Sequence, residues 1–212
     1  MSVITRLFDN YSDAARAVSE LERAGIPADD ISIVANNSDG WYRDNNLADV
    51  RRDPDGGRVI DRDHDGVDDR TEGAGAGAGI GATIGGVAGL LAGLGLLAIP
   101  GIGPVVAAGW LASTAALAAA GGVTGGIIGA LTQAGVSEEE AHAYAEGVRR
   151  GGTLVTARVP DGERNRYEAI LDRAAVNMRE RTAFYQKTGW SRFNPNDRPY
   201  TVDEITRERE LY

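Results

Sequence analysis

The residues whose types and spacing best suit chemistry form an acidic segment of twelve positions, 61–72. Aspartates stand at its first, third, fifth and ninth positions, glycine at its sixth and glutamate at its twelfth. EF-hand loops place the oxygen ligands of Ca²⁺ at this spacing, and the glycine permits the sharp turn. The expected Ca²⁺ ligands are Asp61, Asp63, Asp65, the backbone carbonyl of Val67, Asp69 and Glu72.

The sequence around this segment departs from an EF-hand in two ways. Asp68 fills the eighth position, where EF-hand loops usually carry an apolar residue. Pro54, Gly56 and Gly57 come shortly before the segment, so no helix is expected to lead into it. The alternative interpretation is a solvated acidic turn, because aspartate and glycine are common in turns.

No set of residues predicts an enzyme. The chain has two histidines and no cysteine. His64 fills a non-ligand position of the acidic segment, and we expect His142 to be exposed just after a helix cap. No catalytic triad or phosphate-binding loop can be assembled, and a net charge of -9 argues against nucleic-acid binding. We expect no catalytic residue, no nucleic-acid partner and no identified small-molecule substrate.

An uncharged stretch, residues 73–137, divides a chain that is otherwise rich in charge. Glycines recur at every fourth position before and after a Pro-Gly-rich joint at 99–104. Residues four apart share one face of a helix, and a row of glycines lets a second helix approach closely. We therefore expect a long glycine-zipper helical hairpin over 73–136. Its helix-packing residues are Gly73, Gly77, Gly81, Gly85, Gly89, Gly93, Gly121, Gly125 and Gly129.

Two environments suit such a hairpin. The uncharged runs 79–99 and 105–131 are each long enough to span a bilayer as a helix. Glycine and alanine are abundant in both runs, so insertion into lipid would be only weakly favourable. Outside a membrane, the outer face of the hairpin would have to be buried in a homo-oligomer. We expect assembly through the hairpin, either at the inner membrane with a cytoplasmic domain or as a soluble cytoplasmic particle.

The segments on either side of the hairpin predict a small α+β domain in two halves. Residues 1–35 alternate a strand, a helix and a second strand. A polar loop, 36–72, then leads to the hairpin. In the second half, 137–180, a helix capped by Ser137 and Glu140 precedes a strand at 153–159, another helix and a short strand at 175–178.

This order of elements suits a ferredoxin-like antiparallel sandwich, with its helices on one face and the hairpin inserted between its halves. Residues 181–212 are expected to form an extended C-terminal tail, in which 201–212 suit one short exposed helix. Such a tail is either mobile or anchored through Trp190, Phe193 and Tyr200.

Four segments carry a resemblance to a known family: 3–8, 14–18, the glycine-rich hairpin and 144–152. In these segments the chain resembles the bacterial general-stress or heat-induced stress proteins of the YflT type. The similarity covers roughly residues 1–180. It implies a non-catalytic stress-response protein, in a family often predicted to be membrane-associated, and it supplies no active-site residue.

Overall fold

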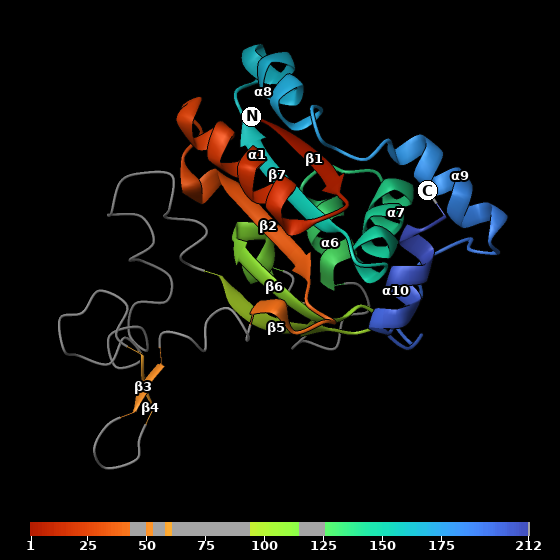
Figure 1. Cartoon of the computed structure of the whole chain (residues 1–212). Coiled ribbons are helices and arrows are strands. Elements are labelled where there is room, and N and C mark those ends of the chain that lie inside the picture. The colour runs from red at the N-terminus through yellow and green to blue at the C-terminus, as the bar shows by residue number, and fades with distance from the viewer. Residues whose placement is uncertain (43–49, 53–57, 61–93, 115–125, 212) are drawn as a thin grey trace.

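The main sheet of the computed structural model is antiparallel and mixes distant parts of the chain. The structure describes residues 1–42, 50–52, 58–60, 94–114 and 126–211. The strands are β1 (Ser2–Phe8), β2 (Ile31–Asn36), β3 (Val50–Arg52), β4 (Arg58–Ile60), β5 (Gly95–Ile99), β6 (Gly103–Gly109) and β7 (Thr153–Val159). Five of them form one sheet in the order β1-β7-β2-β6-β5, and β3 and β4 form a separate pair (Figure 1). The expected α+β class with an antiparallel sheet is confirmed.

Both faces of the main sheet are apolar at its centre. On β7, Leu154 pairs with Leu7 of β1 and Val34 of β2. Three positions along, Ala157 pairs with residues of the same two neighbouring strands. Successive side chains of a strand point to opposite faces, so these two rows lie on opposite sides of the sheet. Every residue of β2 is buried, and each face therefore needs a cover.

Helices supply that cover on both faces. On the face of Ile4 lie α1 (Tyr11–Arg23) and α8 (Arg164–Leu171). On the face of Leu7 lie α6 (Gly126–Gln133) and α7 (Glu138–Arg149). The ferredoxin-like arrangement, with its helices on one face only, is therefore not what the structure has. The difference follows from the apolar residues at successive positions of the central strands, which predict burial on two sides.

The two long helices begin with side-chain caps. At the start of α1, the Asn10 side chain accepts a hydrogen bond from the backbone N–H of Asp13 at 2.9 Å. At the start of α7, the Ser137 hydroxyl accepts from the N–H of Glu140 at 3.3 Å, as the sequence predicts. These caps satisfy N–H groups that have no partner within the helix.

The prediction of a glycine-zipper helical hairpin is wrong for those of its residues that the structure describes. Residues 95–99 and 103–109 form β5 and β6, an antiparallel β-hairpin, and β6 also pairs with β2. These strands take residues from both runs that the sequence analysis assigned to helices. Helical structure starts at position 110 and is described as far as 114. Within the described ranges, no helix is both long enough and apolar enough to cross a bilayer.

The C-terminal segment contains two helices, of which the sequence predicted the second but not the first. They are α9 (Met178–Lys187) and α10 (Val202–Arg209). Tyr185 and Phe193 are buried, and Phe193 enters the core beneath α7. The short strand expected at 175–178 does not form, although the Val176 N–H donates to the Leu7 carbonyl at 2.8 Å.

Candidate functional site at the C-terminal strap and the open sheet edge

One face of α7 carries a row of polar residues spaced four apart. They are Glu138, His142, Glu146 and Arg150, the last being the C-terminal cap of the helix. Residues at this spacing lie above one another on a helix. We call this row the polar stripe. It is covered by residues 188–209, which we call the strap.

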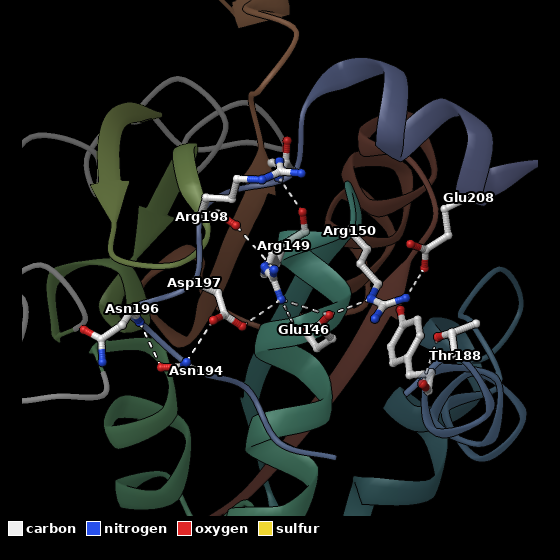
Figure 2. A network of polar contacts seen from close by, with 11 residues as sticks. Glu146, Arg149, Arg150, Thr188, Asn194, Asn196, Asp197, Arg198 and Glu208 are labelled. Atoms are coloured by element: carbon white, nitrogen blue, oxygen red, sulfur yellow. Dashed lines mark hydrogen bonds and ion pairs between the residues drawn. The ribbon is translucent and has the colours of Figure 1, made fainter. Parts of the chain in front are cut away.

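A buried ion cluster occupies the C-terminal end of the polar stripe (Figure 2). The Glu146 side chain is fully buried, and its Oε1 accepts a hydrogen bond from Arg150 Nε at 2.6 Å. Arg150 also donates to Glu208 of α10 at 2.5 Å. Burial opposes the charge on Arg150, but its hydrogen bonds to Glu208 and Glu146 outweigh burial and raise its pKa. The cluster thus joins α7 to the last helix of the chain.

Arg149 extends the cluster along the strap (Figure 2). Its guanidinium donates to Glu146 at 3.1 Å and to the backbone carbonyl of Arg198 at 3.3 Å. It lies 3.8 Å from the Asp197 carboxylate, and 4.7 Å from the centre of the Tyr200 ring. One arginine therefore contacts three positions of the strap. Charge-assisted hydrogen bonds and a cation–π contact both favour the docked strap.

The other end of the polar stripe contains His142, which is 9% exposed and not solvent-exposed as expected. Neither imidazole nitrogen makes a hydrogen bond with the described residues. Its Nε2 lies 3.7 Å from Glu138, whose carboxylate is bonded by Arg192 of the strap. The strap covers the helix here, which is why the exposure prediction failed.

The strap also lies against the turn between β5 and β6. A Cβ atom added to Gly101 would lie 2.8 Å from the Pro195 Cα, and one added to Gly103 would lie 2.9 Å from the Pro199 Cβ. Gly101 has a φ of +76°, which the turn requires and which glycine adopts without strain. The strap therefore connects α7 to the β5–β6 hairpin.

The outer edge of β1 is closed by the chain itself. Three alternate carbonyls of β1 point away from β7 and accept hydrogen bonds from other elements. The Val3 carbonyl accepts from Arg164 at 3.1 Å, and the Thr5 carbonyl accepts from the Tyr144 hydroxyl at 2.9 Å. The third, on Leu7, accepts from the backbone N–H of residue 176. The outward carbonyls of this edge are therefore not free to accept from another strand.

The outer edge of β5 is open in the described structure. The Pro104 carbonyl accepts from the Asn37 N–H at 2.9 Å, so the backbone of Pro104 faces β2. Because backbone groups alternate in direction, positions 103, 105 and 107 of β6 face β5. Their partners are 99, 97 and 95, so the N–H and C=O groups of Leu96 and Ala98 point outward. No hydrogen bond from another described element reaches these groups.

The residues of β5 suit contact with another strand. The strand carries no charge, and Leu96 is 42% exposed. Native edge strands usually carry a charge, a proline or a covering element that prevents pairing. Strand β5 carries neither a charge nor a proline. Among the described residues, the Tyr42 hydroxyl reaches the chain just before this strand and donates to the Leu94 carbonyl at 2.6 Å.

The described surface includes cavities at two places considered as sites. One of about 230 Å³ lies between Tyr11, Trp41 and Arg209, and one of about 300 Å³ lies between α7 and α9. Neither lining contains a histidine or a lysine. Their residues do not pair a nucleophile with a base in the way that covalent catalysis requires.

Most of the sequence-predicted site residues lie outside the described part of the chain. All six expected Ca²⁺ ligands, 61–72, do so, as do the zipper glycines from 73 to 93 and those at 121 and 125. Gly129 is the exception and lies on α6. A Cβ atom there would meet no described atom within 4 Å, so no close helix contact forms at this glycine. The described residues hold no group of three or more His, Asp or Glu placed to bind a metal.

Sequence reasoning missed the polar stripe. The signal was present, because Glu138, His142, Glu146 and Arg150 share the spacing of one helix face. Polar helix faces usually contact water, so the pattern did not predict a segment that covers this face.

Comparison of the chain with protein-family models, curated proteins and solved structures finds no match.

Proposed function

We propose that this chain is a non-catalytic bacterial stress-response protein that assembles with a second copy of itself through the outer edge of β5. The observation that carries the assembly is the contrast between the two edges of the sheet. The chain's own groups close β1, whereas β5 presents outward N–H and C=O groups beside an exposed leucine. The stress role rests on the family resemblance of the sequence.

A second copy is the partner that this edge fits best. Two identical antiparallel β5 strands can exchange backbone hydrogen bonds about a two-fold axis. Neither strand carries a charge that would repel the other. Because the outward carbonyls of β1 are already bonded, β5 is the edge expected to pair, and the expected product is a dimer with one continuous sheet.

Light scattering tests this proposal. The native protein is expected to have about twice the 22.3 kDa mass of one chain. Leu96→Lys places a charge at the interface and should give the mass of a single chain. Val202→Lys is the matched control, because Val202 on α10 is also 42% exposed and its change should leave the dimer intact. A dimer that persists in Leu96→Lys would refute assembly through β5.

We also propose that the assembled protein is cytoplasmic, with attachment to the inner membrane as the alternative. Strands β5 and β6 occupy part of each run that was expected to span the bilayer, which supports the first location. Cell fractionation distinguishes the two. Recovery in the supernatant supports the cytoplasmic location, and a pellet that resists carbonate supports the membrane.

A further inference from the structure

In the described structure, His142 is a buried titratable group between α7 and the strap whose ring nitrogens make no close hydrogen bond. Its ring is covered, and both nitrogens lack a hydrogen-bond partner in the described structure. The other members of the polar stripe are ion-paired to described residues. A neutral imidazole can be buried in this way at modest cost, whereas burial disfavours an imidazolium unless a counter-charge compensates it.

We propose that His142 is a pH-sensitive latch, and that its protonation loosens the strap from α7. An imidazolium at this place would be a largely buried cation that competes for the Glu138 carboxylate, which lies 3.7 Å from its Nε2. It would also lie close to the Arg192 guanidinium, which the strap brings to the same carboxylate of Glu138. The least costly response is movement of the strap, because that movement brings water to the ring and removes the arginine.

The groups around His142 come from two elements. Burial lowers the pKa of His142, and Arg192 on the strap lowers it further. Glu138, on the same helix, and the backbone of Phe193 act in the opposite direction and raise this pKa. Helix α6, which packs against α7, contributes no charged side chain. The net direction is downward, so the docked strap favours neutral His142.

The direction of the pH dependence follows from linkage. With the strap docked, the pKa of His142 lies below its ordinary value of about 6.5. The undocked state therefore binds more protons as the pH falls through about 6.5. Docking is fully favoured above this value and weakens as the pH falls below it.

Loosening of the strap would reach the β5–β6 hairpin. Asn194 and Pro195 lie against Gly101, and Pro199 lies against Gly103, so the turn between the two strands would lose its cover. An acidic pH would then alter the presentation of the β5 edge. This consequence rests on the proposed function, whereas the latch itself depends only on contacts within one chain.

The chain offers a clean test because it contains only two histidines. Imidazole signals in a pH titration by NMR are assigned by His142→Gln and by the matched control His64→Gln. In the same full-length variants, nuclear Overhauser contacts between the Phe193 ring and Gly101 report on the strap, because this ring lies against Gly101 when the strap is docked. A His142→Leu variant repeats the measurement with a side chain that cannot titrate.

The expected result is that His142 titrates below about 6.5 and that the contacts of Phe193 with Gly101 are lost as the pH falls from about 7 to about 5. At equal pH, His142→Gln and His142→Leu should keep those contacts, while His64→Gln should lose them as the native protein does. Equal loss in all four proteins would overturn the latch, as would a His142 pKa above about 6.5. These readouts concern the strap, so a protein that proves monomeric would refute the proposed assembly and leave the latch standing.

Discussion

At the scale of single residues, the Glu146 carboxylate is a charge whose burial is costly unless it has a partner. It is fully buried, and the Arg150 beside it is only 6% exposed. Buried charges of this kind are tolerated when each has a partner, and removal of one partner leaves the other uncompensated. Both residues were visible in the sequence as charges near a helix end, where a solvent-exposed pair is the usual outcome. Their burial depends on Glu208, 58 positions further along the chain from Arg150.

Glu146→Gln should therefore lower the free energy of unfolding by about 3 kcal/mol, because two arginines lose their buried counter-charge. Urea denaturation measures the difference. The control is Glu163→Gln, which breaks the exposed pair with Arg166 and should cost less than about 1 kcal/mol. An equal loss of unfolding free energy in the two variants would contradict the claim that the buried cluster stabilises the fold more than an exposed ion pair does.

The expected Ca²⁺ ligands also belong to this scale, and they stay a prediction from spacing. Calorimetry should detect Ca²⁺ uptake by the native protein at or below about millimolar concentration. Combined Asp61→Ala, Asp63→Ala and Asp65→Ala changes should abolish it. The combined changes Asp49→Ala, Asp53→Ala and Asp55→Ala remove the same charge outside the segment and should preserve binding. Equal uptake by both triple variants would leave only a solvated acidic turn.

At the scale of elements, the sequence predicts structure well where polar and apolar residues alternate. Strands β1, β2 and β7 and helices α1, α7 and α8 form at the expected places. The stretch 95–109 contains no polar side chain. A strand and a helix are distinguished by the spacing at which apolar and polar residues alternate, so this stretch gave no basis for the choice. The spacing of its neighbouring glycines favoured a helix, whereas pairing of β6 with β2 decided the outcome.

The contact between α7 and β1 depends on Gly147. A Cβ atom at this position would lie 2.4 Å from Leu7 Cδ2, which is closer than packed atoms allow. Gly147→Ala should cost about 1 kcal/mol, since overpacking outweighs the gain in helix propensity. Gly129→Ala, on the exposed face of α6, should instead stabilise by up to about 1 kcal/mol.

Thermal or urea unfolding of the two alanine variants gives the comparison. The double variant Gly147→Ala with Leu7→Ala tests the cause, because a shorter side chain at position 7 removes the clash. The cost of Gly147→Ala should then be smaller in the double variant than alone. A glycine zipper at Gly129 would be indicated if Gly129→Ala proved the more damaging change.

At the scale of the whole molecule, the strap and the hairpin are the parts that sequence reasoning did not place. The strap is polar, and its partner is the polar stripe, so no apolar periodicity marks their contact. The openness of an edge is likewise a property of the sheet, because it depends on which strands have neighbours on both sides. Only the order β1-β7-β2-β6-β5 shows that β1 and β5 are the two edges.

The most direct test of the central claim is amide hydrogen exchange resolved at positions 96, 97 and 98. Leu97 faces β6 within one chain, whereas the N–H groups of Leu96 and Ala98 point outward. Assembly through β5 predicts protection of all three amides in the concentrated protein. On dilution to single chains, Leu96 and Ala98 should lose protection while Leu97 keeps it. Rapid exchange of the outward amides in a protein of dimeric mass would contradict the account.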